Sequence, residues 1–459
     1  MKIPSILVFC FLLFCSQVLL GQDVQRTVAP EKALSAYLDK ADESYRWELR
    51  EELEVGGCDV MRLHMTSQTW QNVPWRHVMY VIRPKQLDES RTDGVLLIGG
   101  GRWRAGWPDN GPESVELRGE AQLMAAVAQQ FGCVIGVLLQ VPFQPMMGDK
   151  YEDEIIAATF AQYLKTGDPE WPLLLPMVKS AVRGMDTIVA ASEKHWQLTV
   201  NEFTVTGASK RGWTTWLTGA SDSRATAIAP IVIDMLNMNV QMKHQLAAWG
   251  KYSEQIGDYT ELDLPKYLDT PQGKDLQTIV DPFSYRKSLK QPKLLIFGTN
   301  DRYWPVDASS QYWEELEEPK YMLQVPNQGH SIDDYGRLIG TLASVHRSLH
   351  GDEKLPEMNW EFTENDGKVT LRIRAKGPVD KVSIWKAETS DRDFREAKWS
   401  QHPTKRIGDD LFEYELTKPS SGNVALFGEV LTRSKFMPGF FSTTVGVFSA
   451  VAATEEVKP

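Results

Sequence analysis

The chain has 459 residues, of which 42% are hydrophobic and 24% are charged, and its formal net charge at pH 7 is -11. This length exceeds what one small hydrophobic core requires, so two folding units are expected. The negative net charge argues against a polyanion-binding surface, and we therefore expect no nucleic-acid partner.

The N-terminus, residues 1–22, is typical of a secretory signal peptide. Lys2 precedes an apolar run from Ile6 to Phe14, and small or polar residues follow toward Gly21. Because the run is too short for a membrane span, we predict cleavage near Gly21 or Gln22. The mature protein is then secreted or periplasmic, with no stable membrane insertion after cleavage. An uncleaved N-terminal anchor is the alternative.

Two of the four cysteines, Cys10 and Cys15, lie in the apolar run and would leave with it, so Cys58 and Cys133 remain. In an oxidising compartment these two thiols could pair. The favoured alternative is two separate, buried small side chains. Neither has a second cysteine or a histidine at metal-ligand spacing, so we propose no metal site and expect no cofactor.

Apolar runs and helical periodicity alternate along most of the chain. Glycines at 56 and 57 and the turn at 72–74 divide three antiparallel strands, expected at 45–55, 59–69 and 77–83. Buried strands follow at 94–98, 133–139, 202–206, 225–233, 293–297 and 320–325. Helices are expected at 29–40, 114–130, 152–164, 173–192, 213–220 and 334–350.

Strands that alternate with helices indicate a mostly parallel sheet with helices on both faces, in an α/β fold. We assign residues 23–354 to this domain and expect an inserted segment around 235–281 to roof its pocket. Beyond Pro356 the sequence alternates with a period of two between Asp-Gly and Ser-Gly turns. Residues 355–459 are therefore predicted to form a β-sandwich, immunoglobulin-like or fibronectin-like, with an accessory packing role.

The segment Gly207-Ala208-Ser209-Lys210-Arg211-Gly212 connects the strand at 202–206 to a helix. A serine in such a sharp turn presents its hydroxyl clear of the sheet, and the turn resembles the nucleophile elbow of α/β-hydrolases. Arg211 occupies the position of the usual second glycine, a spacing similar to that of glucuronoyl esterases. An ordinary strand-to-helix turn is the alternative interpretation.

Gly99-Gly100-Gly101-Arg102-Trp103 follows the buried strand at 94–98. Three glycines allow backbone N–H groups to point into a cleft with no side chain in the way. We predict an oxyanion hole from the backbone N–H of Lys210 and from this loop, at Gly101 and Arg102. A flexible loop and a phosphate-binding loop are alternatives, although the phosphate-binding consensus is absent.

Asp301 and His330 each follow a predicted strand, after Ser209 in the chain, in the order nucleophile, acid, base. The imidazole would take the serine proton, and the carboxylate would orient the imidazole and stabilise its charged form. Asp234, which ends the preceding strand, is the alternative acid. Asp301 is also a candidate helix cap, and Asp307 is a nearby competitor.

Basic and aromatic residues are frequent in the loops of the predicted site, and we select Trp103, Arg211 and Trp304 as substrate-binding candidates. If they face the pocket, they favour an anionic or sugar-bearing acyl substrate. Structural ion pairs and core packing are the alternatives. Glu152 and Glu154 either oppose a substrate amine or begin a helix.

Four segments resemble the PhoPQ-activated pathogenicity-related family, and the likeness covers most of the mature chain. In chain order they are Trp171–Ala181, Thr206–Trp213, Gly298–Asp301 and Pro326–His330. The resemblance implies an α/β-hydrolase fold and a serine-hydrolase site at Ser209, Asp301 and His330. It leaves the substrate open.

Our first hypothesis is an exported serine hydrolase that acts on a carboxylic ester through an acyl-enzyme. The substrate would be a small-molecule, carbohydrate or peptide ester. The second keeps the triad but cleaves peptides, as an aminopeptidase-like or dipeptidyl-peptidase-like enzyme. The third is a noncatalytic secreted signalling or binding protein that retains the fold.

Overall fold

The computed structural model of the protein describes residues 28–104, 106–108, 111–112 and 120–450. The predicted signal peptide and the first residues of the helix expected at 114–130 lie outside these ranges. Within the described ranges, no helix has both the length and the apolar character needed to cross a bilayer.

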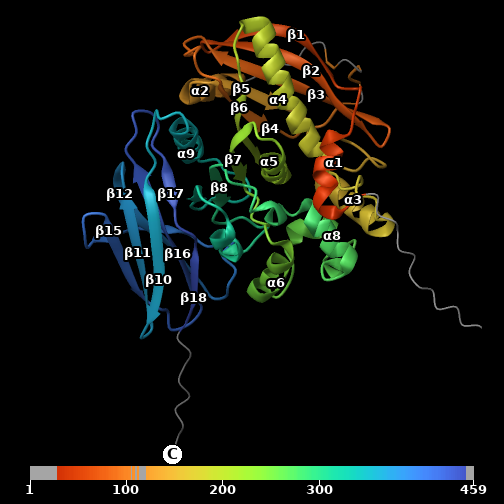
Figure 1. Cartoon of the computed structure of the whole chain (residues 1–459). Coiled ribbons are helices and arrows are strands. Elements are labelled where there is room, and N and C mark those ends of the chain that lie inside the picture. The colour runs from red at the N-terminus through yellow and green to blue at the C-terminus, as the bar shows by residue number, and fades with distance from the viewer. Residues whose placement is uncertain (1–27, 105, 109–110, 113–119, 451–459) are drawn as a thin grey trace, which may run out of the picture.

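The centre of the molecule is a nine-stranded sheet (Figure 1). Across the sheet the strands are β1 (Arg46–Val55), β2 (Cys58–Trp70), β3 (Val73–Pro84), β5 (Val134–Leu138), β4 (Asp93–Ile98), β6 (Glu202–Ala208), β7 (Ala225–Ile231), β8 (Lys293–Gly298) and β9 (Lys320–Val325). The first three strands and β5 pair antiparallel, and β5, β4 and β6 to β9 pair parallel. Only β4 and β5 exchange places relative to chain order, which is the arrangement of the α/β-hydrolase fold. The predicted fold class is confirmed.

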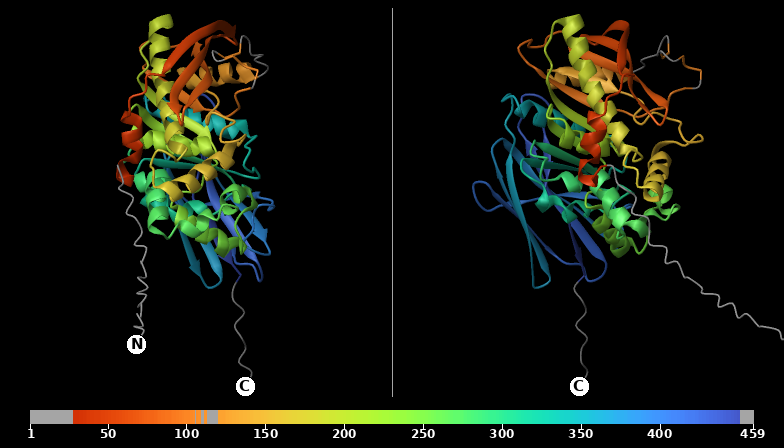
Figure 2. Two further views of the ribbon diagram at one scale, coloured as in Figure 1. Left: turned by 90° about the vertical axis from the view of Figure 1, so that its right-hand side faces the viewer. Right: turned by 45° about the vertical axis from the view of Figure 1, so that its right-hand side comes forward.

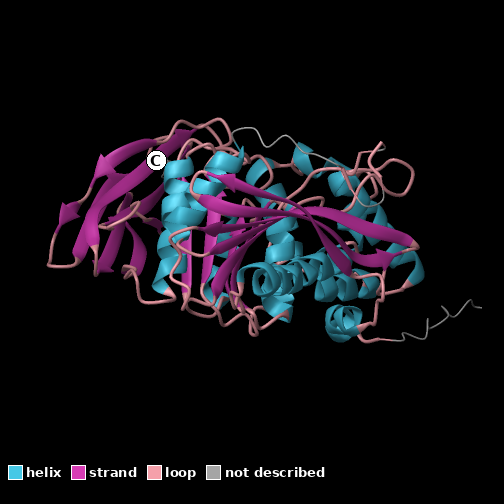
Figure 3. Cartoon of the chain, turned by 90° about the horizontal axis from the view of Figure 1, so that it is seen from above, coloured by secondary structure: helices cyan, strands magenta, loops and turns pink. Residues whose placement is uncertain are grey.

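The strands at the middle of the sheet read as apolar runs because both of their faces are covered. Figure 3 shows helices on both sides of the twisted sheet. The helices are α1 (Ala33–Asp39), α2 (Glu120–Phe131), α3 (Glu152–Thr166), α4 (Leu174–Trp196), α5 (Lys210–Ser221), α6 (Met238–Trp249), α7 (Gly257–Thr260), α8 (Pro271–Val280) and α9 (Tyr335–Ser348). Helices α6 to α8 lie in the stretch between β7 and β8 that we expected to be an insertion.

One boundary differs from the sequence expectation in a way that concerns the site. Strand β7 ends at Ile231 rather than Ile233, because Val232 has a positive φ of 47° and leaves the extended conformation. The backbone N–H of Val232 still donates to Ile296 O at 2.8 Å. The chain therefore turns away from the sheet directly beside the serine elbow.

The C-terminal part consists of two antiparallel sheets that pack face to face. One has the order β10 (Glu357–Asn365), β11 (Lys368–Lys376), β15 (Leu411–Thr417), β14 (Lys405–Arg406). The other has the order β13 (Ser400–Pro403), β12 (Val379–Thr389), β16 (Asn423–Thr432), β17 (Phe440–Ser442), with β18 (Gly446–Ser449) also on β16.

Between the two sheets lies a shared apolar core that includes Leu371, Ile373, Ile384 and Leu426. The predicted β-sandwich is therefore present. Figures 1 and 2 show it against the β8, β9 and α9 side of the large sheet, where β17 packs on β9.

Candidate active site

Ser209 lies at the junction of β6 and α5 in a backbone conformation that is rare for a residue with a side chain. Its φ is 59° and its ψ is -128°, and its N–H donates to Ile231 O at 2.8 Å. Strained positions of this kind persist only where the surrounding structure enforces them, and they concentrate at functional sites. The conformation is the one expected of a nucleophile elbow.

Two glycines let the elbow form. A Cβ added to Gly207 would lie 2.8 Å from Arg211 O, and one added to Gly212 would lie 2.7 Å from the Ile233 side chain. Gly212 thus allows close packing of α5 on the residues after β7, which explains a glycine three residues after the serine.

Arg211, which replaces the usual second glycine, extends toward the glycine loop after β4. A Cβ added to Gly100 would lie 2.6 Å from an Arg211 guanidinium nitrogen, and Arg211 Nε donates to Val141 O. The guanidinium thus fills the room that the missing Gly100 side chain leaves. The predicted oxyanion hole at Gly101, Arg102 and Lys210 stays a prediction.

The two cations of the elbow are bound by acids at the start of α3. Lys210 Nζ lies 3.0 Å from Glu152 Oε2 and 2.9 Å from Asp153 Oδ2, and Arg211 Nη1 lies 2.8 Å from Glu152 Oε2. Burial alone would raise the pKa of Glu152, but hydrogen bonding and charge from Arg211 and Lys210 lower it to about 2. Glu152 is therefore already paired with two cations, Lys210 and Arg211. Glu154 pairs with Lys150.

Asp301 and His330, which are separated by 28 residues in the chain, meet beyond the ends of β8 and β9. His330 Nδ1 lies 2.8 Å from Asp301 Oδ2, while Asp301 Oδ1 accepts from the N–H of Tyr303 at 2.9 Å. The aspartate thus caps the local turn and also holds the imidazole. The Tyr303 ring lies over the imidazole with centroids 4.2 Å apart. Among the described residues, His330 Nε2 has no hydrogen-bond partner.

The alternative acid, Asp234, has a different partner. It accepts a hydrogen bond of 2.6 Å from the Tyr312 hydroxyl. Burial, reinforced by the nearby Asp301 and Asp307 carboxylates, raises the pKa of Asp234 to about 8. A carboxyl that is mostly protonated at neutral pH is a poor partner for an imidazolium. The other competitor, Asp307, lies 2.8 Å from His244 Nε2.

Ser209 and His330 line the same cavity, of about 100 Å³. Trp304, Tyr303 and Lys210 also line it, whereas Arg211 does not. Trp103 lies elsewhere, since it packs on Trp107 and Phe143 and lines a separate pocket. Of the three predicted substrate-binding residues, only Trp304 reaches this cavity.

Helix α6 supports the loop that carries the acid, a role that sequence reasoning missed. Gln241 Nε2 donates to Ala308 O and Gln245 Nε2 donates to Tyr303 O, both at 2.8 Å. Both glutamine side chains are fully buried. This segment was expected only to be part of an inserted roof, and the four-residue spacing of the glutamines, which share one face in a helix, was the available signal.

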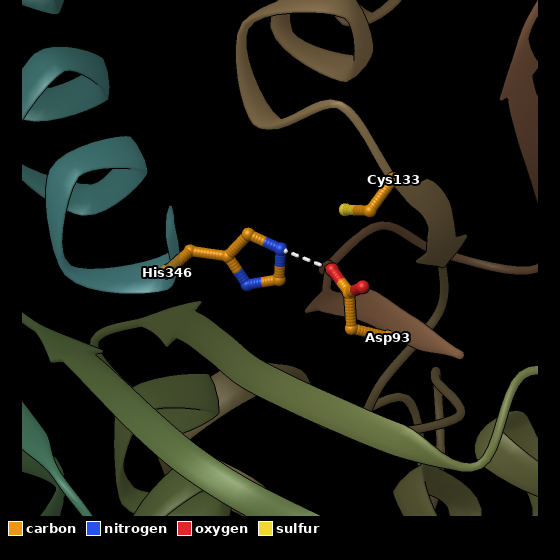
Figure 4. Close-up of side chains that lie close together, drawn as sticks. All are labelled: Asp93, Cys133 and His346. Atoms are coloured by element: carbon orange, nitrogen blue, oxygen red, sulfur yellow. Dashed lines mark hydrogen bonds and ion pairs between the residues drawn. The ribbon is translucent and has the colours of Figure 1, made fainter. Parts of the chain in front are cut away.

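A second cluster of titratable groups lies where β4 and β5 begin, beside α9 (Figure 4). None of its residues lines the cavity. Ligand atoms of Asp93, Cys133 and His346 lie within 4.8 Å of one another, and all three residues are buried. However, Arg91 donates to both oxygens of the Asp93 carboxylate, at 2.8 and 2.7 Å. A carboxylate bound in this way is a poor ligand for a cation, and we interpret the cluster as structural. Cys133 and Cys58 are both free, buried thiols.

Comparison with known proteins gives one family match and one close curated relative. The family described as PhoPQ-activated pathogenicity-related protein matches residues 34–395. Autocrine proliferation repressor protein A of Dictyostelium discoideum is 31% identical over 437 residues, which cover 86% of this chain and 85% of the relative.

Solved structures with a similar fold include two esterases. An acetyl xylan esterase from Paenibacillus sp. R4 has a TM-score of 0.46 and 12% identity, covering 67% of this chain and 89% of that chain. Acetyl xylan esterase 1 from Thermoanaerobacterium sp. JW/SL YS485 has a TM-score of 0.42 and 14% identity, covering 67% and 90%. These values are too low to transfer a substrate to this chain.

Proposed function

The chain belongs to the PhoPQ-activated pathogenicity-related protein family, and from this premise we propose that it is an exported serine hydrolase of carboxylic esters. The observation that carries the proposal is the hydrogen bonding of the two ring nitrogens of His330. Its Nδ1 is bound to Asp301, and its Nε2 has no partner among the described residues. The same imidazole lines a cavity with Ser209.

In the proposed reaction His330 Nε2 takes the proton of the Ser209 hydroxyl while Oγ attacks the ester carbonyl carbon. The tetrahedral oxyanion is stabilised by backbone N–H groups of Lys210 and of the Gly101–Arg102 segment. The carbon–oxygen bond to the alcohol breaks, and the alcohol leaves with the proton from His330. Water, deprotonated by the same imidazole, then releases the carboxylic acid and restores Ser209.

Covalent labelling tests this proposal directly. A fluorophosphonate probe should label the wild type at Ser209 and leave Ser209→Ala unlabelled. Peptide mapping of the adduct identifies the modified residue. A correctly folded wild type that takes up no probe would contradict the proposed chemistry.

The peptidase alternative uses the same three residues and needs a group that binds a substrate amine. Glu152 is the candidate for this amine-binding group, but its ion pairs with Lys210 and Arg211 argue against that role. Turnover of peptides with free amino termini that is lost in Glu152→Gln, with ester turnover retained, would favour it.

A noncatalytic signalling role is the third candidate, because the Dictyostelium relative is named as a repressor of proliferation. In this case Ser209→Ala would keep the biological effect of the exported protein. Loss of that effect together with probe labelling would instead connect signalling to hydrolysis.

The proposed chain organisation is a signal peptide at 1–22, a hydrolase domain at 23–354 and a β domain at 355–459. N-terminal sequencing of the exported protein tests the cleavage site. A mature N-terminus at Met1 would contradict removal of the leader.

A further inference from the structure

The cavity beside Ser209 is built almost entirely from apolar side chains. Phe160 and Leu164 of α3, Trp213 of α5 and Leu276 of α8 contribute to its wall. Apart from His330, the charged residues that line it are Asp153 and Lys210.

These two charges neutralise each other within the wall, since Lys210 Nζ lies 2.9 Å from Asp153 Oδ2. The other Asp153 oxygen accepts a hydrogen bond of 2.9 Å from the Tyr259 hydroxyl. A ligand carboxylate in the cavity would gain no unpaired cation and would lose its hydration, which is costly. The anionic acyl substrate that we expected from the basic residues is thus disfavoured.

Three methionines give the apolar wall an adaptable side. Met235 precedes α6, and Met238 and Met242 lie on α6, four residues apart and therefore on one face. Unbranched thioether side chains adjust to ligands of different length and shape. Such a wall suits a flexible alkyl chain better than a rigid, hydroxyl-bearing sugar.

We infer that the acyl group transferred to Ser209 is an unbranched, uncharged alkyl chain, and that the substrates are esters of medium-chain fatty acids. This inference rests on the proposed function. The acyl group becomes bonded to Ser209 Oγ in the first half-reaction and remains there until water releases it in the second, so the adjoining cavity is the space that it occupies. The alcohol leaves after the first step, so it does not have to fit in this cavity.

The test is a series of p-nitrophenyl esters with acetyl, butanoyl, hexanoyl and octanoyl groups. Burial of each added methylene should raise kcat/KM by about two- to fourfold, until the cavity is filled. A p-nitrophenyl hemisuccinate, which ends in a carboxylate, should react at least about tenfold more slowly than the butanoyl ester. Acetate esters of longer alcohols should show no such rise.

Two matched tryptophan substitutions test whether the dependence on acyl chain length arises in this cavity. Leu268 lines the cavity and is only half-buried, so Leu268→Trp should narrow it without disturbing the core. It should lower octanoyl turnover about tenfold or more and leave acetyl turnover within about twofold. Leu246→Trp is the control, because Leu246 is 41% exposed on the same insertion and does not line the cavity.

Two kinds of failure are distinguishable. If the wild type is labelled by fluorophosphonate but prefers acetyl or hemisuccinyl esters, the chain-length inference is wrong and the serine-hydrolase proposal stands. A rise that follows alcohol length instead would place the alcohol in the cavity and overturn the assignment of the acyl group. If neither labelling nor turnover occurs, the proposed function itself fails.

An independent set of contacts concerns the β-sandwich. Asn300, next to Asp301, donates its side-chain amide to three backbone carbonyls of the sandwich. The distances are 3.3 Å to Phe394 O, 3.2 Å to Arg395 O and 2.7 Å to Ala397 O. Asn327, three residues before His330, makes a reciprocal pair with Trp399, at 3.0 Å to its O and 2.8 Å from its N–H.

The two loops also contact each other, because Asn300 N donates to Gln328 O at 2.9 Å. We propose that the segment 394–399 positions the acid and base loops, with Asn300 and Asn327 as positioning residues. This role also rests on the proposed function. It differs from simple packing, because it predicts an effect on catalysis beyond any loss of stability.

Asn300→Asp tests this role, since it replaces a donor with a carboxylate against three carbonyls. We expect kcat to fall about tenfold with KM within about twofold, and the rate of Ser209 labelling to fall in parallel. Arg337→Gln is the control, because Arg337 pairs with Glu429 across the same interface at 3.1 Å, and its other ion pair is with Asp334 at the N-cap of α9 rather than with Asn300, Asn327 or the segment 394–399. If both variants lower the unfolding temperature equally and leave kcat unchanged, the segment only stabilises the interface.

Discussion

Two of the Asp–His pairs among the described residues have the same separation but opposite surroundings. His330 Nδ1 lies 2.8 Å from Asp301, and His346 Nε2 lies 2.8 Å from Asp93. The His330 side chain is 29% exposed, whereas that of His346 is 1% exposed. The second nitrogen of His346 is bonded to the Thr204 hydroxyl at 2.8 Å, while the second nitrogen of His330 has no partner among the described residues.

This difference teaches that a carboxylate beside an imidazole does not by itself make a general base. Both nitrogens of His346 are engaged, and Asp93 is held by Arg91, so this pair satisfies buried polar groups and fixes α9 against β4 and β6. The His330 pair keeps one nitrogen available in a cavity that contains a strained serine. The assignment of catalysis to one pair and stability to the other makes four measurable predictions.

The largest effect should come from His330→Gln. Removal of the base should lower kcat/KM by about 10⁴-fold or more, while the unfolding temperature stays within a few degrees of the wild type. Steady-state ester hydrolysis and thermal unfolding measure the two quantities. Residual activity above a few per cent would assign the proton transfer to another group.

Asp301→Asn should lower kcat by about 10⁴-fold, because the imidazole loses the carboxylate that orients it and stabilises its charged form. Asp234→Asn provides the control, since Asp234 bonds Tyr312 rather than His330. It should change kcat by less than about threefold. The reverse ranking would make Asp234 the acid.

Asp93→Asn should act on stability rather than on catalysis. Loss of the charge that pairs with Arg91 and binds His346 should cost about 3 kcal/mol of unfolding free energy. Urea unfolding measures this cost, and kcat per folded molecule should remain within about twofold of the wild type. A large fall in kcat without destabilisation would contradict the structural role assigned to the Asp93–His346 pair.

The smallest effect should appear in the pH dependence of stability below about pH 6.5. Burial lowers the pKa of His346, although Asp93 opposes this shift. The unfolded chain therefore binds a proton that the folded chain does not, and stability falls as pH drops below about 6.5, by at most about 1.4 kcal/mol per pH unit.

Burial also lowers the pKa of His64 and His77 to about 4, so they add to the slope in the same window. The difference between the wild type and His346→Gln isolates the His346 contribution. Denaturant unfolding at several pH values measures it. An unchanged slope in the variant would mean that His346 titrates normally in the folded state.

Much of the fold was predictable because buried strands and amphipathic helices have distinct periodicities. The strands on either side of Ser209 were placed to within two residues, and the mostly parallel pairing of the sheet was expected from the alternation of strands with helices. The exchanged order of β4 and β5 was not predicted. Ser209, Asp301 and His330 were identifiable because each lies shortly after a predicted strand. Their catalytic roles remain predictions that the experiments above test.

Side-chain partners were not predictable from sequence position. The basic residues beside Ser209 suggested an anionic substrate, but α3 supplies Glu152 and Asp153 to bind them. Trp103 follows the glycine loop, yet it turns toward Phe143. Such pairings depend on which elements meet in space, and a local pattern contains no information about the distant partner.

Helix α6 combines two tasks on one face. Met238 and Met242 line the cavity, while Gln241 and Gln245 hold the acid loop. Positions i, i+3, i+4 and i+7 of a helix lie side by side, so a substitution that changes how the acyl group fits acts next to the glutamines. Selection for a new substrate at the methionines is therefore constrained by the hydrogen bonds that position the acid loop.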